Sequence, residues 1–454
     1  MLDSASGFLA QSVPALLWFL LFSVPPFAGW WLLFRLPLGR RRFACRITVD
    51  APAALIWRLL DPRGPKGGFN LLHETRDKRR APHSEKPFVR LVEEREAGEG
   101  KGRIVCEAAG ARVVADVDGT GDRTQLTVLY EKPVTGLLDY ELTRLALTRE
   151  LTALGDAALG HGVETAPLFR FAGWRLALLG VVTGLAMAAL LLAPAFYLAL
   201  NALGVSMDAL LATPEALALI LQLAGVATLL LFGLLLAVTL IHEFGHALAL
   251  AAFGHREIVI SLAPFGGGVS IGAHDHADAF EAGVVGLAGP ALSALAAFVV
   301  QPAPSELSEL ARGLASAEPD YAAALVGVAR QAFVLLTLLY NIPNLLPWAG
   351  SDGARAVAAL CRPGRAQQVA AGLLTALLAL LFARADDLVA FGLMFLALEW
   401  FNRRPALAMD SPDSPGRRRL AVAAGLALVV GLYAHEAALL RQIDLPAALS
   451  VTRA

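Results

Sequence analysis

The chain has few cysteines and few lysines, and its 454 residues carry a formal net charge of only -1. The 3 cysteines have no ligand-like spacing, which argues against a disulfide framework and against a cysteine metal site. The near-zero net charge provides no global field that would attract nucleic acid, so we expect no nucleic-acid partner. The lysines all lie between residues 60 and 135, which indicates that this segment is water-soluble.

Apolar sequence is abundant instead. Hydrophobic residues make up 56% of the chain, and the mean hydropathy of +0.59 is far above that of a soluble domain. We therefore expect a polytopic α-helical membrane protein in the lipid bilayer, with about eight spans. The expected spans cover residues 13–36, 174–200, 216–253, 282–300, 322–346, 366–382, 388–400 and 420–433.

Basic residues set the expected orientation. Arg40, Arg41 and Arg42 follow the first apolar stretch rather than preceding it, which favours a retained span over a cleaved signal peptide. By the positive-inside rule these arginines anchor the cytosolic end of that span. The composition, rich in Ala, Leu and Arg, suggests a bacterial cytoplasmic membrane.

The segment after the first span predicts a soluble α+β domain. Residues 47–49 are typical of a strand, residues 53–60 of a helix after Pro52, and residues 88–93, 103–118 and 124–131 of further strands. Leucines from Leu138 to Leu154 then recur with helical spacing. This order resembles the helix-grip (START-like, SRPBCC) fold, and the resemblance implies a cytosolic domain with an apolar ligand between its sheet and its long helix.

The sequence His242-Glu243-Phe244-Gly245-His246 places an ionisable cluster inside a long apolar run. Two histidines four residues apart share one helix face, which suits two imidazole ligands on one Zn²⁺. Glu243 between them is suited to act as general base on water. Ionisable groups are costly inside a membrane, so this cluster predicts a functional site.

A catalytic zinc site needs a third protein ligand. Asp352 follows the span at residues 322–346, and Pro343 and Pro347 interrupt the helix before it. The two histidines and Asp352, which lie on different helices, are therefore expected at the same depth in the membrane.

HExxH in a span, followed by Asn344, Pro347, Asp352 and Gly353 in the pattern N-x-x-P-x-x-x-x-D-G, resembles the site-2 protease family of intramembrane zinc metalloproteases. The resemblance covers residues 216–360. It implies that His242, His246 and Asp352 bind zinc and that Glu243 is the catalytic base. It also implies that Asn344 lies near the active site as a catalytic residue that holds the substrate or an oxyanion. A membrane-spanning protein helix is the implied substrate, cut near the cytosolic face.

Two further segments fit this resemblance. Residues 257–271 predict a hairpin around Gly266, Gly267 and Gly268, which in the family pairs with an unwound substrate; we expect Pro347 to contribute to substrate binding as well. The run from Gly286 to Ser293 is similar to the family's Gly-Pro helix, which packs against the metal-binding helix.

Alternatives stay open at two points. His274 and His276 suit metal binding or a lid, although a polar loop before the next span is the simpler interpretation. The whole chain can instead be a membrane regulator whose helix-grip domain senses an apolar molecule, with a structural or regulatory metal site. A transporter is a third class, disfavoured because no second broken-helix segment is apparent.

These features predict four regions. Residues 1–43 form the first span and its basic anchor, and residues 44–165 form the helix-grip domain. Residues 166–404 form the membrane-embedded metalloprotease domain, and residues 405–454 form a linker and the last span.

Overall fold

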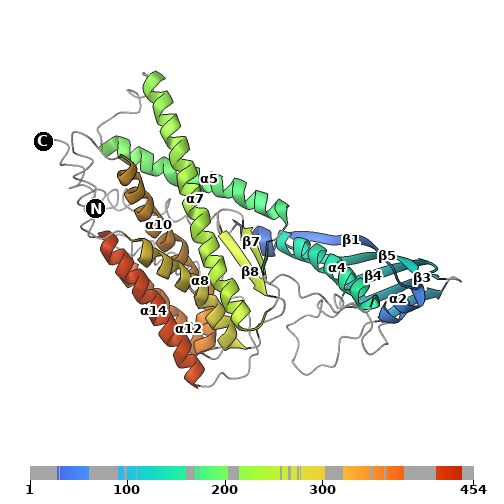
Figure 1. Ribbon diagram of the computed structural model, residues 1–454. Coiled ribbons are helices and arrows are strands. Elements are labelled where there is room, and N and C mark those ends of the chain that lie inside the picture. The colour runs from blue at the N-terminus through green and yellow to red at the C-terminus, as the bar shows by residue number, and fades with distance from the viewer. Residues whose placement is uncertain are drawn as a thin grey trace, which may run out of the picture. The chain divides into compact units, whose positions relative to one another are not determined.

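The computed structural model (Figure 1) describes residues 28–60, 90–159, 169–202, 214–301, 321–382 and 416–441, apart from short gaps at 30, 97–99, 109, 172, 256–257, 264–266, 273–275, 277, 348–350 and 362–363. The chain divides into two compact units, one formed by residues 28–167 and the other by residues 1–27 and 168–454. Each unit is described by itself.

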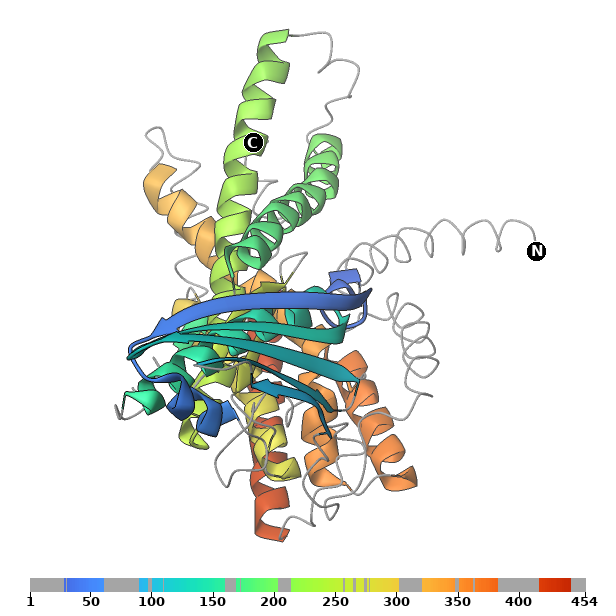
Figure 2. The same cartoon turned by 90° about the vertical axis from the view of Figure 1, so that its right-hand side faces the viewer.

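The first unit is built on a five-stranded antiparallel sheet with the order β1-β5-β4-β3-β2 (Figure 2). Its strands are β1 (Pro37–Val49), β2 (Arg90–Glu96), β3 (Lys101–Ala108), β4 (Ala111–Thr120) and β5 (Arg123–Thr135). Alternate residues of β4 and β5 are buried, as expected for a sheet with one covered face. Val113 and Val128 are examples with no exposed surface.

Two helices contribute to the core of this unit. Helix α2 (Ala53–Leu60) has the bounds predicted from the sequence, and α4 (Leu137–Ala158) is the expected long closing helix. Leu147 and Leu151 of α4 join Ile56 of α2 in one apolar cluster with the buried residues of the strands. At about 25 cal/mol per Å² of apolar surface, such burial is the main term that stabilises the unit.

The start of this sheet differs from the expected domain boundary at residue 44. Strand β1 begins at Pro37, so the arginines interpreted as a membrane anchor lie on a strand. Arg40 and Arg42 each form an ion pair with Glu131 on the neighbouring strand β5, at 3.2 and 3.0 Å. The segment 103–118, predicted as one β-rich stretch, is divided between β3 and β4.

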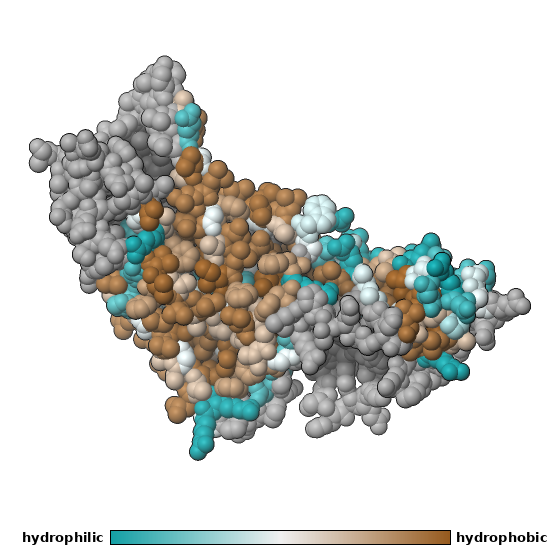
Figure 3. All heavy atoms as spheres, viewed as in Figure 1, coloured by the Kyte–Doolittle hydropathy of each residue, from teal (hydrophilic) through white to brown (hydrophobic). Residues whose placement is uncertain are grey.

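The second unit is helical. Its helices are α5 (Trp174–Ala202), α7 (Pro214–Ala252), α8 (Ala279–Val300), α10 (Tyr321–Leu345), α11 (Asp352–Leu360), α12 (Arg365–Phe382) and α14 (Gly416–Arg441). Among the described residues, five helical segments are long and apolar enough to cross a membrane, namely 174–192, 224–252, 279–300, 326–345 and 416–439. Apolar side chains also cover much of the outer surface of these helices (Figure 3), so the chain has the character of an integral membrane protein. The expected span at 388–400, and most of the one at 13–36, lie outside the described residues.

A three-stranded sheet lies beside α7 (Figure 1). Its hairpin, β7 (Ile258–Ala263) and β8 (Gly267–Gly272), confirms the prediction for this segment, and β6 (Phe169–Phe171) pairs with β7 in parallel. Ile258 and Ile260 are buried against Ala247 and Leu250 of α7. The hairpin is therefore fixed on the helix that carries the HExxH motif.

Candidate metal centre

The HExxH motif lies near the C-terminal end of α7, where both histidines and the glutamate are buried. Because His242 and His246 are one helical turn apart, their rings point to the same side of α7. The two Nε2 atoms lie 2.9 Å from each other. Two imidazole nitrogens this close to each other could bind the same metal ion.

Asp352 joins this pair from the first turn of α11. Helix α10 ends at Leu345, and the Ser351 hydroxyl caps α11 by accepting a hydrogen bond from the amide of Ala354 at 3.0 Å. This cap turns the Asp352 carboxylate inward. Its Oδ2 lies 3.2 Å from Nε2 of His242, and its Oδ1 lies 3.5 Å from Nε2 of His246.

Helix α8 packs directly against α7 at the site. A Cβ atom on Gly245 of α7 would overlap the backbone carbonyl of Ala288, and a Cβ atom on Gly289 would overlap the ring of His246. The expected small-residue helix is therefore present, and its small residues allow the two backbones to approach closely.

The Nδ1 atom of each histidine already has a hydrogen-bond partner. Nδ1 of His242 lies 2.6 Å from Oδ1 of Asn341, and Nδ1 of His246 lies 2.6 Å from the carbonyl oxygen of Val285. The Asn341 amide nitrogen donates to the carbonyl of Thr337 at 2.8 Å, so Oδ1 of Asn341 faces His242 as an acceptor. Both imidazoles must then donate from Nδ1, which leaves a lone pair on each Nε2.

The three inward-facing groups at the site are consequently all acceptors. Two Nε2 lone pairs and the Asp352 carboxylate converge in a buried space, where unsatisfied acceptors are costly. A cation at their centre satisfies all three, and outer partners such as Asn341 and Val285 are the usual means of orienting zinc-bound imidazoles. The buried group His242, His246 and Asp352 is therefore able to hold a metal ion.

Glu243 lies on the side of α7 that faces the hairpin. The Ser270 hydroxyl of β8 lies 2.8 Å from Oε2 of Glu243 and 2.9 Å from its backbone carbonyl. Gly268 lies against the same side chain, because a Cβ atom there would overlap the Glu243 carboxyl group. Strand β8 therefore positions the carboxylate beside the two histidines.

Tyr340 and Asn341 are contributors to which the sequence interpretation gave no role. The ring of Tyr340 packs edge-on against His242, with 5.1 Å between ring centroids. Its hydroxyl is placed to hydrogen bond with Thr239 and with the backbone of Gly268. In the sequence, Tyr340 and Asn341 could have been noticed because they lie in the proline-interrupted segment. Their role could not be predicted, because tertiary packing decides which face of α10 turns toward α7.

The other predicted residues are distributed as follows. Gly267 begins β8, and Pro347 is buried just after α10. Asn344 is half-buried in the last turn of α10, and among the described residues none is hydrogen bonded to its side chain. Gly266 lies outside the described residues.

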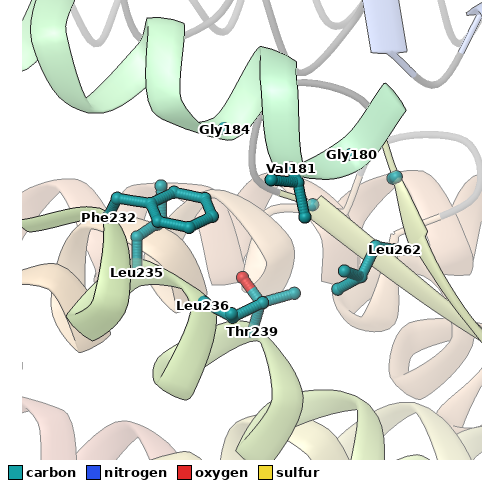
Figure 4. Close-up of a pocket in the computed structure, with 10 residues that line it drawn as sticks. Gly180, Val181, Gly184, Phe232, Leu235, Leu236, Thr239 and Leu262 are labelled. Atoms are coloured by element: carbon teal, nitrogen blue, oxygen red, sulfur yellow. The ribbon is translucent and has the colours of Figure 1, made fainter. Parts of the chain in front are cut away.

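An apolar pocket adjoins the site between α5, α7 and the hairpin (Figure 4). Val181 of α5, Phe232 and Leu235 of α7, and Leu262 of β7 line it. Thr239, one helical turn before Glu243, also lines this pocket, whose cavity volume of about 10 Å³ is close to the space that one water molecule needs.

The site thus combines three convergent metal-capable groups with a buried carboxylate and an adjacent apolar pocket. Such a combination could hold a metal ion close to a buried acid–base group. Comparison with protein-family models, with curated proteins and with solved structures finds no match to this chain.

Proposed function

We propose that the protein is an intramembrane zinc endopeptidase that resembles the site-2 proteases. The observation that carries the proposal is the buried convergence of His242, His246 and Asp352, with both Nδ1 atoms held from outside. The HExxH glutamate stands next to it, in a helix apolar enough to span a membrane. A purely structural metal site would not need this glutamate.

The chemistry assigns distinct work to each residue. Zinc held by the two histidines and Asp352 would supply a Lewis acid that polarises the scissile carbonyl and acidifies water. Glu243 takes the proton from the attacking water and delivers it to the leaving amide nitrogen. Ser270 keeps the Glu243 carboxylate oriented, and Asn341 and Val285 keep both Nε2 lone pairs turned inward.

The substrate in this proposal is a membrane-spanning helix that unwinds locally. An intact helix hides its carbonyls in hydrogen bonds, so the cleaved segment must become extended. Strand β8 is the last strand of the described three-stranded sheet, and it offers backbone groups for pairing with such a segment close to Glu243. We assign Gly267 and Gly268 to this pairing.

The sheet unit is proposed as a helix-grip domain on the cytosolic side of a bacterial membrane. Its strand order, the short helix after β1 and the long helix after β5 support this assignment. Such a domain suits an apolar ligand between sheet and helix. The alternative function, a ligand-sensing regulator with a structural or regulatory metal site, rests on this unit, and the two functions can coexist if the unit regulates cleavage.

The decisive experiment separates metal binding from proton transfer. His246→Ala should lower the zinc content of the purified protein by about one ion per chain, because it removes one of the three ligands. Glu243→Gln should leave the zinc content unchanged while uncleaved substrate accumulates in membranes, which quantitative membrane proteomics would detect. Normal substrate processing by Glu243→Gln would exclude Glu243 as the base.

A further inference from the structure

A second group of metal-capable side chains lies at the base of the β7–β8 hairpin, among residues that the proposed catalysis does not use. It comprises His255, His276 and Glu281, whose ligand atoms all lie within 4.8 Å of one another. Oε1 of Glu281 lies 2.8 Å from Nε2 of His255 and 3.1 Å from Nδ1 of His276. His255 and Glu281 are buried, and the side chain of His276 is 25% exposed.

Local structure holds two of these residues in place. Helix α7 ends in a Schellman motif, in which Gly254 has a positive φ of 88° and the amide of His255 donates to the carbonyl of Leu250 at 3.1 Å. His255 is thereby fixed as the last residue of the motif. Its ring lies against Gly272, where a Cβ atom would overlap it.

Glu281 is fixed at the opposite side of the cluster. Asp278 caps α8 and accepts a hydrogen bond from the amide of Glu281 at 2.8 Å. The other carboxylate oxygen of Asp278 is paired with Arg418 at 2.7 Å, so Asp278 is already engaged. Glu281 is therefore the carboxylate that faces both imidazoles.

The charge balance of the cluster favours a cation. A buried carboxylate is costly unless a positive charge or several hydrogen bonds compensate it. Two imidazoles and one carboxylate form a ligand set that suits zinc, and the partial exposure of His276 leaves access for a water ligand.

We propose that His255, His276 and Glu281 form a second binding site for a divalent transition-metal ion of the zinc type. This site joins the end of α7, the segment after β8 and the first turn of α8, so a bound ion clamps both ends of the hairpin to the helices. Ser270, two residues before Gly272 on β8, contacts Glu243. The second ion therefore fixes the strand that positions the proposed base.

The two sites are neighbours, but they share no ligand. Val285, whose carbonyl holds His246, lies one helical turn after Glu281 on α8, which is about 6 Å along the helix axis. The second site follows from its own residues and stands whether or not the protein is a protease.

Metal stoichiometry of the full-length protein, purified in detergent and dialysed after loading with Zn²⁺, tests the proposal. We expect about two zinc ions per chain in the wild type and about one in His276→Ala or Glu281→Gln, because each variant removes one ligand of the second site. The partly exposed position of His276 and the similar shape of glutamine protect these variants from simple misfolding. His435→Ala, which alters a histidine that contacts Phe298 outside both groups, is the matched control and should retain both ions.

Titration with Co²⁺ provides a second measurement, since two sites should give two equivalents of visible absorption and the His276→Ala variant only one. The proposal is overturned if the wild type binds a single zinc ion that His246→Ala abolishes and that His276→Ala leaves intact; His255, His276 and Glu281 are then a hydrogen-bonded cluster only. Loss of one ion in His276→Ala but none in His246→Ala would keep the second site and defeat the zinc protease instead.

Discussion

At the scale of single residues, Asn341 shows how a group that touches no substrate can determine the chemistry of the centre. Its amide oxygen accepts from Nδ1 of His242, while its amide nitrogen is committed to Thr337. This arrangement permits only the tautomer whose Nε2 lone pair faces Asp352. Asn341 thus positions His242, one of the three residues that could hold a metal ion.

Replacing Asn341 should weaken metal binding. In Asn341→Ala, His242 loses the partner that fixes its tautomer, and outer partners of this kind are typically worth about 10- to 100-fold in metal affinity. Competition with a fluorescent zinc chelator measures the affinity. Asn344→Ala, one turn away on α10, is the control and should leave the zinc affinity unchanged. The cleavage rate of Asn344→Ala separately tests the role predicted for Asn344 in holding the substrate or an oxyanion. Equal zinc affinity in the two variants would contradict the role of Asn341.

The three residues that could hold a metal ion were predictable from the sequence because their signals are local. A spacing of four residues places His242 and His246 on one helix face regardless of the remaining fold. Asp352 could be predicted because prolines mark the end of the helix that precedes it. Asn341 was not, since its role depends on which face of α10 turns toward α7, and helix rotation is decided by tertiary packing.

At the scale of elements, the close contact between α7 and α8 maintains the centre. Gly245 admits the backbone of Ala288, and Val285 on the same helix holds His246. Any widening of this contact therefore acts on His246, which is proposed to bind the metal. The helices are held by van der Waals packing, which small residues make possible in a membrane.

Gly245→Ala should lower both stability and zinc affinity. The added methyl group would overlap the Ala288 carbonyl, and overpacking of this kind costs about 1–3 kcal/mol. Thermal unfolding in detergent micelles and zinc content report the two effects. Gly233→Ala, on the same helix with no atom within 4 Å of the new Cβ, is the matched control. If both variants unfold at the same temperature, the contact does not constrain α8.

Elements were predictable to the extent that their patterns were unambiguous. Helix α2 and the β7–β8 hairpin agree with the sequence because Pro52 and the glycine-rich turn punctuate them. The start of β1 did not follow from the sequence, because apolar residues up to Leu36 run directly into the strand and Arg40 to Arg42 resemble a membrane flank. The contact between His255 and Glu281 forms because the fold brings the two ends of the hairpin together, and no local sequence pattern predicts this.

At the scale of the whole molecule, the proposed centre is complete within one unit. The residues proposed to bind, orient or assist the metal all belong to the unit formed by residues 1–27 and 168–454 (His242, Glu243, His246, Ser270, Val285, Asn341 and Asp352). The sheet unit has its own apolar core, built from its strands, α2 and α4. Each unit therefore has the internal packing that a separately folding part requires.

Removal of the sheet tests this division. In a variant in which a flexible Gly/Ser linker replaces residues 37–158, the zinc content should equal that of the full chain, because no metal ligand is lost. Cleavage should continue, but it should no longer respond to the apolar molecules that the sheet unit is proposed to bind. Metal analysis and a substrate-processing assay in membranes measure the two outcomes. Loss of zinc would show that the helical unit depends on the sheet, whereas cleavage with unchanged regulation would remove the basis for ligand sensing.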